Sequence, residues 1–240
     1  MRILVTNDDG IASKSLRALA HWAEKLGEVT VVAPKVEQSG KSQSIDFFHP
    51  VEIKRVEFDG IEAFAMDSTP ADCVRFGVLG LEREYDLILS GINYGYNLGD
   101  DIAYSGTIGA IFEASRMGFK AIAFSTDKDG FDNAVAELDE VYSFIEEKEL
   151  LKHTELLNVN IPTEKSKGIR ITHQGGMFYS DSFVCCGNDM YKQVGEPVKG
   201  DPSNLTVDIN AIRGGYVSIS PLTANKTDLA AYAKLKDLYK

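Results

Sequence analysis

Short apolar runs alternate along the chain with segments whose apolar residues recur at helical spacing. Residues 2–6 (RILVT) and 29–33 (VTVVA) are β-rich runs. Between them the apolar positions recur every three or four residues, at Leu16, Leu19, Ala20, Ala23 and Leu26. Gly10 precedes this segment and Gly27 ends it. Strand–helix–strand units with short connections are typical of a parallel sheet that carries helices on both faces.

The same alternation continues to about residue 167. Buried strands are expected at 86–90, 120–125 and 157–162, and helices at 71–81, 108–118 and 134–147. Asp59-Gly60 between two β-rich runs predicts a hairpin. Ser68-Thr69-Pro70 predicts a helix start, because a hydroxyl cap precedes a proline in the first turn.

Beyond about residue 168 the pattern weakens. We therefore expect two parts: an α/β core with a mostly parallel sheet over residues 1–167, and a C-terminal extension over residues 168–240. The extension holds β-rich segments and an amphipathic helix at 227–239. That helix must bury its apolar face somewhere, either on its own domain or on a partner.

The net negative charge of the chain limits the classes of partner that it can bind. The formal net charge is −11, from 25 basic and 36 acidic residues, which disfavours nucleic-acid polymers and membrane surfaces. No run of 18 apolar residues occurs, and no signal peptide is visible before the first acids. The three cysteines cannot all pair and have no CxxC spacing. We expect free buried thiols in a cytoplasmic protein.

Three polar segments follow predicted strands: residues 7–10, 34–44 and 91–107. In open parallel sheets, ligands bind at the carboxyl ends of the strands. The topology therefore predicts that these segments meet at one edge of the sheet and form a site there.

The first of these segments pairs Asp8 with Asp9. Two carboxylates about 4 Å apart repel each other by roughly 4 kcal/mol at an effective dielectric of 20, so a cation or a shared proton must offset the repulsion. Oxygen ligands suit a hard divalent ion such as Mg²⁺, Mn²⁺ or Ca²⁺. The alternative is structural, because Asp-Gly is a common turn and aspartate can cap the following helix.

The other two segments add neutral oxygens and an anion site. Residues 34–44 supply Ser39 beside Lys41, although a solvated loop is an alternative interpretation. Residues 91–107 contain Asn93 and Asn97, and long glycine-rich loops of this kind are usually functional. They end in Tyr104-Ser105-Gly106-Thr107 at a helix start, where free N–H groups can bind an anion or where a hydroxyl merely caps the helix.

With these motifs the chain resembles the survival protein E (SurE) family of nucleotidases. The likeness runs from residue 1 to about 222, and its matching stretches are MRILVTNDDGI, VTVVAPKVEQSGKSQSI, STPADCV, DLILSGINYGYNLGDDIAYSGTIGA, LNVNIP and GGYVSISPL. The resemblance implies a metal-dependent phosphatase that acts on nucleoside 5′- and 3′-monophosphates and on short polyphosphate. It also implies a homodimer that exchanges C-terminal elements, sometimes within a tetramer.

The resemblance assigns residues as well. It implies that Mg²⁺ or Mn²⁺ is bound by Asp8, Asp9, Ser39 and Asn93, and Ca²⁺ can occupy the same ligands. It implies a phosphate site lined by Asn97, Ser105, Gly106 and Thr107, beside which we place Asn7. We expect Asp8, Asp9, Asn97 and Ser105 to be catalytic.

One aspartate would act as general base or nucleophile, and we favour Asp8. The chain departs from the family pattern at Ser15, Ser68 and Tyr96. The last two are expected to border the nucleoside pocket.

Two other classes share part of the pattern. A receiver-type signalling module also places acids after its first strand, but it needs a phosphate-accepting aspartate after its third strand. Here Ser90-Gly91 stand at that place. A dinucleotide-dependent oxidoreductase needs GxGxxG after the first strand, and the chain has none.

Overall fold

The computed structural model describes residues 1–201 and 203–239. In this part of the chain a nine-stranded mixed sheet has the order β3-β4-β2-β1-β5-β6-β7-β11-β8. Its strands are β1 (Arg2–Thr6), β2 (Glu28–Pro34), β3 (Ile53–Val56), β4 (Glu62–Met66), β5 (Leu87–Tyr94), β6 (Ala121–Thr126), β7 (Leu156–Asn160), β8 (Ile169–Ile171) and β11 (Val217–Leu222). The α-helices are α1 (Lys14–Ala23), α2 (Pro70–Arg75), α3 (Gly106–Arg116), α4 (Phe131–Glu147), α5 (Asp208–Arg213) and α6 (Leu229–Leu235). The fold is the α/β class predicted from the sequence.

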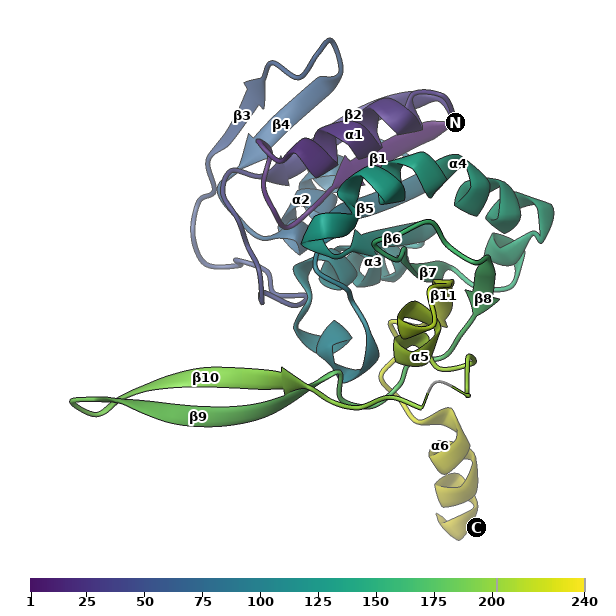
Figure 1. The fold of residues 1–240 in the computed structure, drawn as a ribbon. Coiled ribbons are helices and arrows are strands. Elements are labelled where there is room, and N and C mark those ends of the chain that lie inside the picture. The colour runs from purple at the N-terminus through teal and green to yellow at the C-terminus, as the bar shows by residue number, and fades with distance from the viewer. Residues whose placement is uncertain (202, 240) are drawn as a thin grey trace.

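Helices cover the central strands on both faces (Figure 1). Successive side chains of a strand point to opposite faces, so each strand contributes to two cores. Ile3 and Val5 of β1 pack with α1 and α4, whereas Leu4 packs on the other side with α2 and α3. β1 runs parallel to β2 and to β5, which brings the carboxyl ends of all three strands to one edge.

The predicted local elements form with one difference. β3 and β4 are an antiparallel hairpin, and Asp59 and Gly60 have the positive φ angles, 51° and 86°, that its turn requires. The helix expected at 71–81 is shorter. α2 ends at Arg75, and a π-helical turn (η1, Phe76–Gly80) continues the chain.

Part of the segment after residue 167 belongs to the main sheet. β11 pairs antiparallel with β7 and parallel with β8, so both extend the sheet beyond the predicted core. A two-stranded ribbon of β9 (Tyr179–Gly187) and β10 (Met190–Pro197) and the helix α6 project from the body instead (Figure 1). The division at residue 167 stays a prediction.

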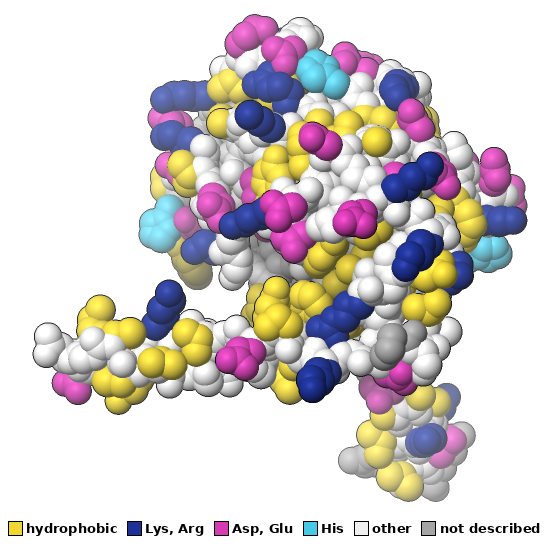
Figure 2. Space-filling view, in the orientation of Figure 1, with side chains coloured by type: hydrophobic (Ala, Val, Ile, Leu, Met, Phe, Trp, Pro, Cys, Tyr) yellow, Lys and Arg dark blue, Asp and Glu magenta, His cyan; other side chains and the backbone are white. Residues whose placement is uncertain are grey.

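The ribbon and α6 expose many side chains that are normally buried. Figure 2 shows hydrophobic side chains on both projections, and the large exposed ones include Phe183, Met190, Tyr191, Leu229, Tyr232, Leu235 and Leu238. The expectation of buried thiols was wrong for two cysteines, because Cys185 and Cys186 lie on the ribbon and only Cys73 is buried. None of the described helices has the length and apolarity needed to cross a bilayer.

Candidate active site

The three polar segments meet at the carboxyl edge of the sheet, as predicted. The backbone N–H of Gln38 donates to the Asp8 carbonyl at 2.7 Å, and that of Ser42 donates to the Tyr104 carbonyl at 3.0 Å. The Thr107 hydroxyl donates to a carboxylate oxygen of Asp8 at 2.6 Å. The loops that follow β1, β2 and β5 are therefore joined directly to one another.

A tight turn presents the two aspartates. The Asn7 side-chain amide makes two hydrogen bonds to Gly10, each 3.2 Å long. Its nitrogen donates to the Gly10 carbonyl, and its oxygen accepts from the Gly10 N–H. Gly10 has φ +96°, and a Cβ there would lie 3.2 Å from the backbone of Val36. Asn7 thus shapes the turn, and its contact with substrate stays a prediction.

Asp8 points toward the start of α3. Its side chain is 4% exposed, and burial raises its pKa although the Thr107 hydrogen bond acts in the opposite direction. Gly106 passes so close that a Cβ there would lie 2.9 Å from the Asp8 Cβ. The glycine of the predicted phosphate site is therefore needed to let α3 begin against this carboxylate.

Asp9 faces the other side of the edge. Burial raises its pKa to about 7, the charge of Asp8 adds to this, and a hydrogen bond from the Tyr94 backbone N–H opposes it. Its oxygen Oδ2 is buried and has no hydrogen-bond partner in the structure. A buried unpaired carboxylate oxygen is costly, so the site is suited to a cation or a proton.

The predicted metal ligands are all oxygen donors, which fits a hard divalent ion. Ser39 is exposed and donates to Glu37 at 2.6 Å, and it lines the same cavity as Asp9. The Asn93 amide nitrogen donates to the Gly95 carbonyl at 2.7 Å, so its NH₂ group is turned into the loop. The described residues contain no group of three or more His, Cys, Asp or Glu that could hold a metal, so serine and asparagine must complete any site here.

Asn97 is fixed by a buried polar network. Its amide nitrogen donates to Ser125 at 2.7 Å, and its backbone carbonyl accepts from Asn158 at 2.8 Å and from Asn160 at 2.9 Å. Sequence reasoning had not assigned these partners. The signal was present, because Asn158 and Asn160 alternate with apolar residues and lie on one face of a buried strand.

Ser105 is the N-cap of α3. Its hydroxyl accepts from the Ile108 N–H at 3.2 Å, which is the structural alternative recognised in the sequence. The cap leaves the N–H groups of the first turn at the edge where Asp8 lies, and the helix dipole favours an anion there. Phosphate binding by Ser105, Gly106 and Thr107 stays a prediction.

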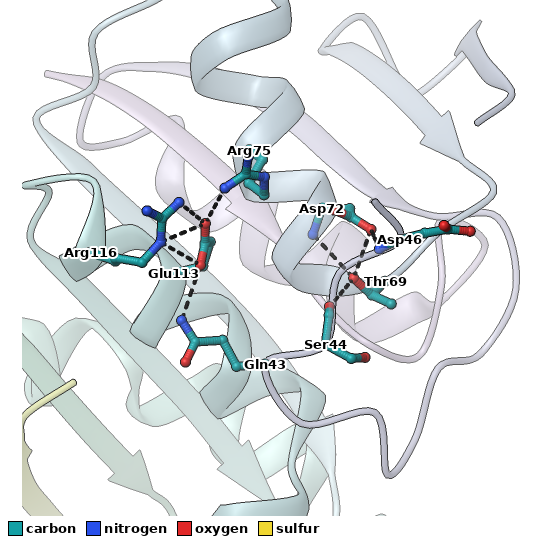
Figure 3. A network of polar contacts seen from close by, with 8 residues as sticks. All are labelled: Gln43, Ser44, Asp46, Thr69, Asp72, Arg75, Glu113 and Arg116. Carbon is teal, nitrogen blue, oxygen red and sulfur yellow. Dashed lines mark hydrogen bonds and ion pairs between the residues drawn. The ribbon is translucent and has the colours of Figure 1, made fainter. Parts of the chain in front are cut away.

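The Ser39 loop, residues 35–52, lacks regular structure but is tied to α2 and α3 (Figure 3). Gln43 donates to Glu113 at 3.0 Å, and Glu113 is 3% exposed. Burial alone would raise the pKa of Glu113, but hydrogen bonds from Arg116, Arg75 and Gln43 outweigh burial and lower it. Nothing in the sequence pattern indicated this long-range contact.

A second tie holds the same loop near α2 (Figure 3). The Asp72 carboxylate accepts from the Asp46 N–H at 2.8 Å, and the Thr69 hydroxyl donates to the Ser44 carbonyl at 2.6 Å. Ser68 belongs to this tie, because its hydroxyl donates to Asp72 at 2.5 Å. Tyr96, in contrast, packs against the small cluster of Leu98, Ile209 and Ile212.

The fold and the site define a class: a Rossmann-like α/β protein whose paired carboxylates and helix start converge at the carboxyl edge of the sheet. The chain belongs to the survival protein SurE family, whose sequence profile matches residues 3–181. It is 38% identical over 254 residues to the 5′-nucleotidase SurE of Aeromonas hydrophila, covering 99% of this chain and 97% of the relative. It is 39% identical over 249 residues to the 5′-nucleotidase SurE 1 of Thermus thermophilus, covering 99% and 96%.

A solved structure agrees with this assignment. The crystal structure of the SurE protein from Aquifex aeolicus superposes with a TM-score of 0.84 at 32% sequence identity, and the match covers 100% of both chains. The match therefore runs over the full length of this chain and is not confined to the main sheet.

Proposed function

We propose that this protein is a metal-dependent phosphatase that hydrolyses nucleoside monophosphates to nucleoside and phosphate. The observation that carries the proposal is the Asp8–Asp9 pair, in which Asp8 contacts the start of α3 and Asp9 keeps a buried oxygen with no hydrogen-bond partner among the described residues. A carboxylate pair of this kind suits a cation, and an N-terminal helix turn beside it suits an anion. The relatives that match over nearly the whole chain are named 5′-nucleotidases.

The residues that would hold the metal are Asp8, Asp9, Ser39 and Asn93. When bound there, Mg²⁺ or Mn²⁺ supplies positive charge against the phosphate oxygens and lowers the pKa of a bound water. Ca²⁺ accepts the same oxygen donors.

The chain's own groups bind and orient the phosphate. The backbone N–H groups at the start of α3, those of Gly106 and Thr107 included, and the Ser105 hydroxyl donate to phosphate oxygens, and Asn97 does the same from its fixed position. The Thr107 hydroxyl holds the Asp8 carboxylate in one orientation. Asp8 then serves as general base toward water or as nucleophile toward phosphorus.

The finer substrate range follows the family resemblance. We propose activity on 3′- as well as 5′-monophosphates and on short polyphosphate, in a cytoplasmic protein. We also propose a homodimer, which can pair into a tetramer. The exposed apolar side chains of the β9–β10 ribbon and of α6 support this, because a second copy would cover them.

A phosphate-release screen over nucleoside monophosphates and polyphosphate tests the proposal. Release should require a divalent ion, stop with EDTA and return with Mn²⁺ or Mg²⁺. No release under any of these conditions would refute the phosphatase function. A stable aspartyl phosphate after incubation with acetyl phosphate would instead favour the receiver alternative.

A further inference from the structure

Beside Asp9 the edge of the sheet opens into a cavity of about 680 Å³. Its walls are the start of α1, the Ser39 loop, the end of β5 and the connection from β6 to α4. Two predicted metal ligands, Asp9 and Ser39, line it. A phosphate ester held by these ligands therefore has this cavity available for the rest of the molecule, and the volume is typical of small-molecule sites.

One wall of the cavity is aromatic. The rings of Tyr94 and Phe131 lie 5.8 Å apart between centroids, with 56° between their planes. Both side chains are half-buried, so part of each ring faces the cavity that they line. Tyr94 lines the cavity together with Asp9, which places the aromatic wall beside the predicted metal site.

The charged residues that line the cavity disfavour a substrate that carries further phosphate groups. Glu37, Asp129 and Asp132 line it together with two cations, Lys14 and Lys128. Carboxylates outnumber ammonium groups even before Asp9 is counted. An uncharged group is therefore favoured over further phosphates in this space, whereas the lysines can meet polar atoms at its rim.

We propose that this cavity binds the nucleoside part of a nucleoside monophosphate, with its base stacked on one ring of the Tyr94–Phe131 pair and in edge contact with the other. The inference rests on the proposed function, because it takes the phosphate to lie at the Asp8–Asp9 edge. Base–aromatic stacking tolerates every base, since each has a π-face, so the site discriminates nucleotides from aliphatic phosphate esters more than one base from another.

A second cavity, of about 440 Å³, flanks the site near α2. Its described lining includes Lys41, Ile45, His49 and Ser68, but none of the four predicted metal ligands. Phe47 and Phe48 are exposed in the same loop without lining it. This cavity is the competing location for the nucleoside, and the same experiment distinguishes the two.

The test compares kcat/KM for adenosine 5′-monophosphate with kcat/KM for glycerol 2-phosphate, which has no aromatic leaving group. Phe131→Leu and Tyr94→Leu should each lower the ratio of the two by about tenfold. The matched variants Phe131→Tyr and Tyr94→Phe keep an aromatic ring and should retain the wild-type ratio. Unfolding curves verify that all four variants fold.

An unchanged ratio in both leucine variants would overturn the inference. So would a loss of the ratio in His49→Leu alone, because His49 lines the second cavity and that result would place the base there. Adenosine binding, measured by calorimetry on the full chain, separates this inference from the proposed function. Loss of adenosine binding in Phe131→Leu supports the subsite even if no phosphate ester is hydrolysed, and unaltered binding contradicts it.

Discussion

The two sides of the site differ although their central residues are neighbours in sequence. On the α3 side, Asp8 is buried, accepts a hydrogen bond from the Thr107 hydroxyl and lies against the backbone of Gly106. On the α4 side, Asp9 lines an open cavity and keeps a buried oxygen without a partner. Under the proposed function this difference corresponds to separate duties: Asp8, besides binding the metal, would take part in the chemistry, and Asp9 would bind the metal beside the cavity proposed for the leaving group.

Removing the Asp8 charge should have the largest effect. Asp8→Asn should lower metal-dependent phosphate release by about a thousandfold, because both a ligand and the candidate base or nucleophile are lost. The assay is steady-state phosphate release at saturating Mn²⁺. Asp189→Asn, an exposed position at the ribbon turn, is the matched control and should behave as wild type. Full turnover in Asp8→Asn would contradict the assignment.

Loosening Asp8 without removing it should have a smaller effect. Thr107→Val deletes the hydroxyl that donates to Asp8 while preserving the shape of the side chain. Turnover should fall by about 10–100-fold, the usual loss for a group that orients a metal ligand. Thr107→Ser keeps the hydroxyl and should recover most of the activity. Equal activity in the valine and serine variants would show that the hydrogen bond does not matter.

Metal binding should depend on pH because protonation of Asp9 competes with the metal. Its pKa in the metal-free protein is raised to about 7, so a proton competes with the metal below that pH. The apparent Kd for Mn²⁺ should increase by about tenfold per pH unit below 7 and level off above it. Calorimetric titration from about pH 5 to about pH 9 measures this. A flat profile across that range would be inconsistent with the raised pKa.

The same raised pKa affects folding. A carboxyl group whose folded-state pKa exceeds its unfolded value, 3.8 here, stabilises the folded protein fully only below that value. The stabilisation is lost as pH rises through about 7. The metal-free protein should therefore melt at a lower temperature above neutral pH, and Asp9→Asn should weaken this pH dependence. Thermal unfolding in EDTA at a series of pH values provides the measurement.

Weakening the contact between the Ser39 loop and α3 should have the smallest effect on metal binding. Gln43→Leu removes one hydrogen bond to Glu113, which keeps both of its arginine partners. A single hydrogen bond contributes about 0.5–1.5 kcal/mol, so Mn²⁺ affinity should fall only a few-fold through a less ordered Ser39. Gln193→Leu, an exposed position on the ribbon, makes the same exchange far from the loop. Identical Mn²⁺ affinities in the two variants would show that the hydrogen bond between Gln43 and Glu113 does not affect metal binding.

Local sequence signals predicted the sheet edge well. The alternation of strands and helices, the Asp59-Gly60 turn and the helix start after Ser105 each depend on neighbouring residues. Because parallel strands end at one edge, the convergence of the three loops followed from topology alone.

What the sequence did not reveal depends on long-range contacts. The partners of Asn97 come from β6 and β7, and that of Gln43 from α3. Alternation marks Asn158 and Asn160 as one face of a strand, but no local pattern encodes which distant residue each side chain meets. The shortened α2 has a similar origin. A Cβ at Gly77 would lie 2.7 Å from Leu4, so this stretch packs tightly on β1, a contact that helical periodicity does not indicate.

The exposure of the β9–β10 ribbon bears on how the stability of the protein depends on its concentration. Every residue of its two strands is exposed, and an isolated two-stranded ribbon is only marginally stable in water. Its order must come from whatever covers it. If that cover is a second copy of the chain, association and ribbon order are one equilibrium, and dilution alone should lower the melting temperature and make the ribbon the first segment that a protease cleaves.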